Sequence, residues 1–145
     1  MSGPNKNLNT ALDRIKAYFE NCPEISAVYL FGSQIKGNAR KGSDLDIAVL
    51  FAEGFSPLDR FEKKLGILND LEDLLEIELD LVDLESVDLF FLHQVMKAKI
   101  LLVEQDKNRR VEFEVNKRKE YFDRKHFFEL YHQQALKRLD QQRSN

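Results

Sequence analysis

The sequence predicts an α+β fold in which a small mixed β-sheet is flanked by helices and followed by a helical C-terminal extension. Short apolar or alternating segments recur between segments with helical apolar spacing, in the order helix, strand, strand, helix, strand, helix, strand, helix. No glycine or proline follows Gly66, so the charged C-terminal segment is predicted to be a long helix or a helix pair. At 145 residues the chain fits one unit, with a domain over 1–106 and the extension over 107–145.

The first three elements follow from local signals. A helix is expected to begin at Thr10, because Asp13 follows three residues later as in a capping box, and to end before Pro23. Two adjacent strands are then predicted over Ser26–Phe31 and Asp44–Phe51, which are rich in β-branched, aromatic and other apolar residues. Glycines punctuate the loop between them.

The remaining elements of the domain have equally local signals. A helix is predicted over 56–75, because Ser56 suits the N-cap and Pro57 the first helical position. Residues 77–81 alternate strictly between apolar and acidic side chains, which predicts a half-buried strand. A short helix and an edge strand are predicted at Val87–Met96 and Ile100–Val103.

Charge is distributed unevenly along the chain. Residues 1–106 carry 11 Lys and Arg against 19 Asp and Glu, a net −8, whereas residues 107–145 carry 11 against 6, a net +5. The acidic part disfavours a direct nucleic-acid substrate, because it repels phosphate. No apolar stretch approaches the ~20 residues of a membrane span, and the N-terminus lacks a signal-peptide core. The sequence therefore predicts a soluble, cytoplasmic protein with no membrane partner.

Acidic residues stand at the start of the second predicted strand. Residues two apart in a strand point to the same side, so Asp44 and Asp46 are expected to share one face. Asp80, from the next strand, supplies a third carboxylate; Glu78 on the same face and Asp83 on the opposite one are alternatives to it. Such oxygen donors favour two Mg²⁺ ions, with Mn²⁺ as a substitute, which activate an attacking hydroxyl and hold a triphosphate.

The loop before these acids is predicted to bind the phosphates of a nucleotide. Gly32 lets the backbone approach a phosphate closely, and Ser33 offers an N–H and a hydroxyl. Further candidates for nucleotide binding in the same loop are Lys36, Arg40, Lys41 and Ser43. Which basic residue contacts the triphosphate stays open.

Gly32-Ser33, ten intervening residues, Asp44-Leu45-Asp46 and the later Asp80 together resemble the signature of minimal nucleotidyltransferase (MNT) domains of the DNA polymerase β-like superfamily. The resemblance covers about residues 10–105. It implies a polymerase β-like nucleotidyltransferase fold. It also implies that the three aspartates are the catalytic and metal-binding triad, and that the Gly-Ser pair begins the nucleotide-phosphate loop.

A short domain of this kind with a helical tail resembles the antitoxins of HEPN/MNT toxin–antitoxin pairs, a type VII-like system. That resemblance implies a protein adenylyltransferase that moves AMP from ATP to a tyrosine hydroxyl of a HEPN ribonuclease toxin and so neutralises it. Two alternatives stay open. One is an antitoxin that acts by steric capture of the toxin without catalysis, and the other is a nucleotidyltransferase for a small molecule.

The extension carries aromatic residues at spacings that suit a contact surface. Phe128, Tyr131, Ala135 and Leu139 follow 3/4 spacing and are expected to form one stripe on a helix. The stripe either packs on the domain's own sheet or forms a docking surface for a partner protein. Aromatic residues outside this stripe are Phe113, Phe122 and Phe127.

Overall fold

The computed structural model describes residues 4–32 and 45–143, and its elements follow the predicted order. The helices are α1 (Pro4–Glu20), α2 (Pro57–Leu75), α3 (Leu89–Ala98) and α4 (Lys107–Arg143). The strands are β1 (Ile25–Phe31), β2 (Leu45–Phe51), β3 (Leu79–Asp83) and β4 (Ile100–Glu104). The predicted α+β class is therefore confirmed.

The four strands in the described part of the chain form one mixed sheet in the order β3-β2-β1-β4. β1 is antiparallel to β2 and to β4, whereas β2 is parallel to β3. A parallel pair needs a crossover connection, and α2 provides it. The central strands β1 and β2 are buried along their whole length, which explains why both are continuous apolar runs in the sequence.

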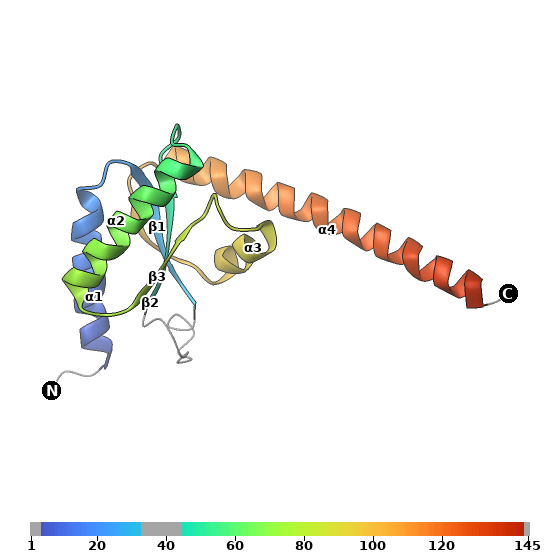
Figure 1. Cartoon of the computed structure of the whole chain (residues 1–145), viewed down its shortest axis with the longest axis horizontal. Helices are drawn as coiled ribbons and strands as arrows, with labels where there is room; N and C mark the ends of the chain where they lie inside the picture. The colour runs from blue at the N-terminus through green and yellow to red at the C-terminus, as the bar shows by residue number, and fades with distance from the viewer. Residues whose placement is uncertain (1–3, 33–44, 144–145) are drawn as a thin grey trace.

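Two hydrophobic cores lie on opposite faces of the sheet (Figure 1). On one face, Phe19 of α1 and Leu71 of α2 belong to the same cluster as Ile47 of β2. On the other face, Leu92 of α3 and Phe113 of α4 form a cluster with inward residues of β1 and β2. Because side chains alternate along a strand, every residue of β2 is assigned to the α1/α2 face or the α3/α4 face.

The start of α1 differs from the prediction. The helix begins at Pro4, so Thr10 lies inside it and does not cap its N-terminus. Proline is favourable near a helix start, because its missing N–H would have no intrahelical acceptor there. Leu8 is partly buried and packs against the core one turn before Leu12, and this contact favours a helix that starts before the residue that resembles a capping box.

The predicted start of α2 is confirmed, but the predicted third strand is displaced. The Ser56 hydroxyl caps α2 by accepting a 3.1 Å hydrogen bond from the backbone N–H of Asp59. At the other end, Glu76 adopts a left-handed conformation with φ 55° and donates its N–H to the carbonyl of Glu72. This helix cap delays entry into the sheet, so β3 starts two residues later than the predicted 77–81 segment.

The extension is one helix rather than a helix pair. α4 has 37 residues, and its buried residues, Phe113 and Glu114, lie near its N-terminal end. The rest of the helix projects away from the sheet (Figure 1), and the side chain of Tyr131 is 65% exposed. The expected stripe therefore does not pack on the domain's own sheet. None of the described helices combines the length and apolarity that a membrane span requires.

Glu114 fixes α4 to the sheet. Its buried carboxylate accepts hydrogen bonds from the Tyr29 hydroxyl at 2.9 Å and the Arg110 guanidinium at 2.6 Å, and it also pairs with Lys99. Burial raises the pKa of Tyr29 to about 12, so its hydroxyl remains a donor at neutral pH. One carboxylate thus joins α4 to β1 and to the residue that precedes β4.

Replacing Glu114 by alanine is expected to lower the free energy of unfolding by about 3 kcal/mol, because Lys99, Arg110 and the Tyr29 hydroxyl lose a buried acceptor. Urea denaturation measures this change. Glu120→Ala on the same helix is the matched control; its exposed pairs with Lys117 and Arg124 contribute less than about 1 kcal/mol. Equal losses in the two variants would contradict the anchoring role.

Candidate functional site

Two acidic residues meet where β2 and β3 begin. Asp46 of β2 is directly opposite Asp80 of β3 in the parallel register, so both side chains project to the same face of the sheet. This is the α3/α4 face, because Leu45 and Ile47, the neighbours of Asp46, lie in the α1/α2 core. Asp46 is 8% exposed, whereas Asp80 is exposed. The common face predicted for Asp44 and Asp46 stays a prediction, because Asp44 lies outside the described residues.

Gly32 makes room for the Asp46 carboxylate. It directly follows Phe31, which is in register with Asp46, and its φ of 88° is left-handed. A Cβ added at Gly32 would lie 2.9 Å from Asp46 Cγ and nearer still to Oδ2. A side chain at this position would have to displace the carboxylate. The phosphate contact predicted for Gly32 stays a prediction, and the close approach of Asp46 is a second reason for glycine here.

Asp83, an alternative third carboxylate in the sequence, serves the core instead. It projects to the face opposite Asp80 and forms a buried ion pair with Arg60, with 2.7 Å between Asp83 Oδ2 and Arg60 Nε. The same oxygen accepts a 2.8 Å hydrogen bond from the Ser86 hydroxyl. Asp83 therefore lies on the face opposite Asp46 and Asp80, and its carboxylate is already held by Arg60 and Ser86. Glu78 is exposed and precedes β3, so it stays an alternative to Asp80.

The other predicted site residues lie outside the described part of the chain; they are Ser33, Lys36, Arg40, Lys41, Ser43 and Asp44. Within residues 4–32 and 45–143, no three His, Cys, Asp or Glu side chains are grouped so that they could hold a metal ion. Asp46 and Asp80 supply two carboxylates of the predicted set. Their oxygen-only chemistry fits Mg²⁺ or Mn²⁺.

Aromatic side chains border the acids on the α3 side, and no role was predicted for them. The rings of Phe31 and Phe91 meet edge to face, with 6.1 Å between centroids, and Phe91 is 40% exposed. The signal in the sequence was the pair Phe90-Phe91 after Asp88, which caps α3. Two adjacent residues of a helix point in different directions, so both rings could not face the same core.

Comparison with known proteins identifies relatives of this chain. The family model described as polymerase beta, nucleotidyltransferase, matches residues 13–108. The curated protein adenylyltransferase MntA of Shewanella oneidensis is 37% identical over 82 residues, which are 57% of this chain and 56% of MntA. The match thus spans little more than half the length of that relative.

Solved structures share the fold. One similar chain is in the crystal structure of a toxin–antitoxin with AMP-PNP, with a TM-score of 0.55 and 27% identity over 83% of this chain and 89% of that one. Another is in the complex of a tri-AMPylated Shewanella oneidensis HEPN toxin with its MNT antitoxin, with a TM-score of 0.57 and 27% identity over 81% and 87%.

Asp80 and Asp83 lie on one strand and give a matched pair of variants. Asp83→Asn is expected to lower the free energy of unfolding by about 3 kcal/mol, because it leaves the Arg60 charge buried without its partner. Asp80→Asn is expected to leave stability within about 0.5 kcal/mol and to weaken Mn²⁺ binding by at least about tenfold. Urea denaturation and titration calorimetry measure the two effects. If Asp83→Asn lost Mn²⁺ binding but stayed as stable as the wild type, Asp83 rather than Asp80 would be the metal ligand.

Gly32 and Gly54 give a second matched pair. Both have left-handed φ values, 88° and 101°, but a Cβ at Gly54 meets nothing within 4 Å. Alanine at either position is expected to cost about 1–2 kcal/mol of stability from backbone strain. Only Gly32→Ala is expected to weaken Mn²⁺ binding, because its methyl group displaces the Asp46 carboxylate. Unchanged Mn²⁺ affinity in Gly32→Ala would show that this contact is dispensable.

Proposed function

The chain belongs to the polymerase β nucleotidyltransferase family, and we propose that it is an antitoxin with protein adenylyltransferase activity toward a HEPN ribonuclease toxin. The observation that carries the proposal is that Asp46 and Asp80 are opposite each other in the register of β2 and β3 and project to one face of the sheet. The Asp46 carboxylate lies against Gly32. The relative named protein adenylyltransferase supports the reaction class. The similar chains in toxin–antitoxin structures support the class of acceptor.

In the proposed reaction, a tyrosine oxygen of the toxin forms a bond to the α-phosphorus of ATP. The bond from that phosphorus to the oxygen bridging to the β-phosphate breaks, and pyrophosphate leaves. The phenolic proton passes to solvent. AMP remains on the toxin as a phosphodiester, which adds a bulky anionic group to its surface and blocks its ribonuclease activity.

The proposed metal-binding carboxylates are Asp44, Asp46 and Asp80. Divalent ions bound there would lower the pKa of the attacking hydroxyl and neutralise charge on the leaving pyrophosphate. Asp46 and Asp80 are directly opposite each other on the neighbouring strands β2 and β3. The sheet therefore fixes the positions of two of these carboxylates before a ligand binds. The nucleotide is proposed to contact Gly32, Ser33, Lys36, Arg40 and Ser43.

A protein acceptor suits the surroundings of the acids better than a small molecule does. Asp80 is exposed, and the neighbouring ring of Phe91 is 40% exposed. A small acceptor needs walls that exclude water and fix its orientation, whereas a protein acceptor brings its own surface. Exposed apolar area next to the reacting groups is a feature of protein-docking sites.

The test is transfer of AMP to a cognate HEPN ribonuclease, the class of acceptor that the proposal names. With ATP and Mg²⁺, the wild-type chain is expected to add AMP to a tyrosine, and mass spectrometry of the HEPN protein detects the added mass. Asp46→Asn is expected to lower the rate by at least about 10³-fold, because a carboxylate of the reaction centre is lost. Asp73→Asn, an exposed position on α2, is the control and is expected to retain the wild-type rate.

Absence of AMP on the HEPN protein after incubation with the wild-type chain would refute the proposed activity. Steric capture makes a different prediction in cells. If capture alone neutralised the toxin, cells carrying the Asp46→Asn chain would survive expression of the HEPN protein as well as cells carrying the wild-type chain.

A further inference from the structure

A row of aromatic rings leads from the acidic pair to the projecting helix. We call the exposed rings the aromatic surface; they belong to Phe91, Phe90, Phe128 and Tyr131, and the buried ring of Phe31 connects them to the acidic pair. Phe31 is in register with Asp46 and contacts Phe91, as described above. Phe90, the neighbour of Phe91 on α3, lies 5.9 Å from Phe128 of α4 between ring centroids. Of the two rings on α3, Phe91 therefore lies on the side toward Phe31 and Asp46, and Phe90 lies on the side toward α4.

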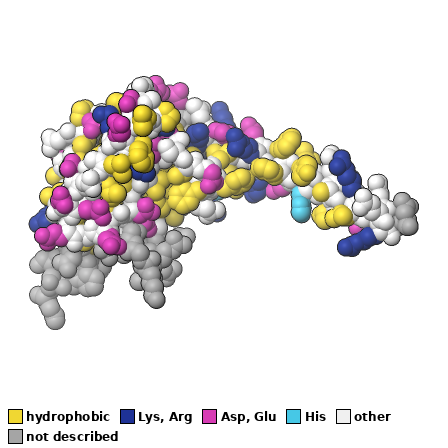
Figure 2. Space-filling view, viewed as in Figure 1, with side chains coloured by type: hydrophobic (Ala, Val, Ile, Leu, Met, Phe, Trp, Pro, Cys, Tyr) yellow, Lys and Arg dark blue, Asp and Glu magenta, His cyan; other side chains and the backbone are white. Residues whose placement is uncertain are grey.

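The far end of the aromatic surface is hollowed. A groove of about 510 Å³ lies where α3 meets the projecting part of α4. Its lining includes Phe90, Phe128 and Tyr131, with Lys125 and His132 beside them. Phe90 is 45% exposed and Phe128 53% exposed, so a large apolar area faces solvent. Figure 2 shows hydrophobic side chains continuing from the body along α4, with basic side chains among them.

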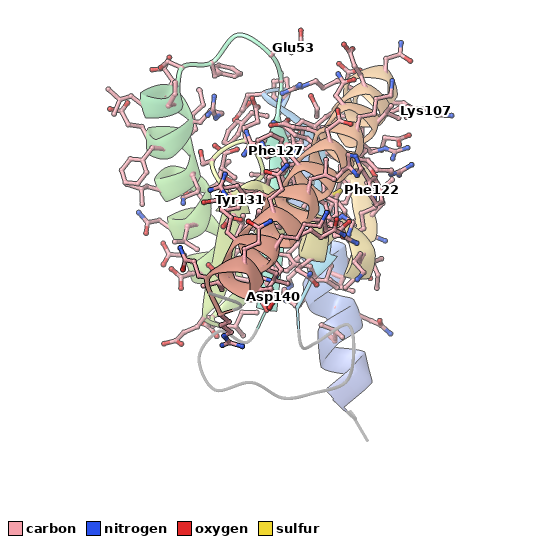
Figure 3. All side chains as sticks on the ribbon, turned by 90° about the vertical axis from the view of Figure 1, so that its right-hand side faces the viewer. Glu53, Lys107, Phe122, Phe127, Tyr131 and Asp140 are labelled. Carbon is pink, nitrogen blue, oxygen red and sulfur yellow. The ribbon has the colours of Figure 1, made fainter. Side chains whose placement is uncertain are left out.

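The projecting part of α4 carries apolar side chains on more than one side. Phe127 and Tyr131 lie on one side of the helix and Phe122 on the other (Figure 3). Their exposures are 68%, 65% and 51%. Phe122 thus lies outside the predicted stripe, as the sequence indicated, whereas Phe127 lies on the same side of the helix as Tyr131 of the stripe. A helix with apolar residues on opposite sides is normally buried on both, which indicates a partner that encloses it.

Charge indicates what kind of partner fits. Residues 107–145 carry a net +5, but residues 120–143 carry five Lys and Arg against four Asp and Glu, so the basic excess lies at the base of α4. There Lys117 and Arg118, with Lys97 of α3, line a cavity between the two helices. The wall of this cavity also includes Tyr121, whose ring contacts Phe90 of the aromatic surface. Apolar side chains supply most of the affinity in protein interfaces, and complementary charge at the rim steers association. The fitting surface is apolar at its centre and acidic at its edge.

We propose that the acceptor protein docks on the aromatic surface and encloses the projecting part of α4, through apolar side chains flanked by acidic ones. This inference rests on the proposed function, since the docked protein is the one that receives AMP. It assigns residues 107–145 as a docking element. The same contact that holds the acceptor also brings its hydroxyl toward Asp46, because Phe91 of the aromatic surface lies on the side toward Phe31 and Asp46.

The acceptor suits this surface better than a second copy of the chain. Residues 1–106 of a second copy are acidic, with a net −8, and would match the charge of α4. However, a copy seated on the aromatic surface would cover the side from which an acceptor hydroxyl reaches Asp46. The acceptor protein avoids this conflict, because the same molecule occupies the aromatic surface and supplies the hydroxyl.

The test measures binding in full-length chains that carry Asp46→Asn, so that AMP transfer does not contribute. The probe is the same purified HEPN ribonuclease that serves as the acceptor in the AMP-transfer test, titrated by calorimetry. Tyr131→Asp and Phe122→Asp, on opposite sides of α4, are each expected to raise Kd by roughly 30-fold or more. Phe61→Asp is the matched control: its ring is 53% exposed on α2, over the other face of the sheet, and a change below about threefold is expected.

Circular dichroism checks that each variant stays helical. Unchanged affinity in Tyr131→Asp and Phe122→Asp, or an equal loss in Phe61→Asp, would overturn the docking surface. So would a dimer of the chain alone, seen by light scattering, that Tyr131→Asp dissociates. If the wild-type chain transfers no AMP but the α4 variants still lose binding, the proposed activity fails and the docking surface stands. If the wild-type chain transfers AMP but the α4 variants bind as tightly as the parent chain, the docking surface fails and the proposed activity stands.

Discussion

The close approach of the Asp46 carboxylate to Gly32 fixes the geometry of the whole site. It requires that Phe31 pair with Asp46 across β1 and β2, and this register is locked because both strands are buried on two faces. A slip by one residue would turn Asp46 into the α1/α2 core and bring Ile47 to the reaction side. The hydrophobic pattern of β2 thus specifies the position of the Asp46 carboxylate, a proposed metal ligand, and Gly32 has no Cβ to obstruct it.

The short strand β3 carries two acids with different roles: Asp80 is a proposed metal ligand, and Asp83 stabilises the fold. Asp80 and Asp83 are three residues apart, so strand alternation sends them to opposite faces. Asp83 is enclosed by Arg60 and Ser86 and ties α2 to the end of β3. Asp80 has no such enclosure and stays exposed beside Asp46. The crossover helix is therefore fastened by one acid, which leaves the other accessible to ligands.

The sequence predicted most of the fold, because its signals are local and its strands are strongly patterned. It misplaced the start of α1, where the partly buried Leu8 favours an earlier start than the capping-box pattern at Thr10, and the start of β3, where the left-handed cap at Glu76 delays the strand. Asp80 was predicted to supply a carboxylate from the next strand, and the structure places it opposite Asp46 on the same face of the sheet. The structural role of Asp83 could not be predicted from the sequence, because its partner Arg60 is 23 residues away and no spacing pattern links the two.

The anchoring of α4 bears on how a partner could bind it. A free helix with this charge and aromatic content would lose conformational entropy on docking, and that loss would weaken the complex. Here Glu114 joins the first turns of α4 to Tyr29 and Lys99, and the Phe90–Phe128 contact supports the helix further along. The projecting turns therefore continue a helix that is already formed, at an angle set by the domain. Rigidity at the base lets exposed rings far from the sheet keep a fixed position relative to Asp46, and the proposed transfer of AMP to a docked protein would require this, because the acceptor hydroxyl must reach one atom of ATP.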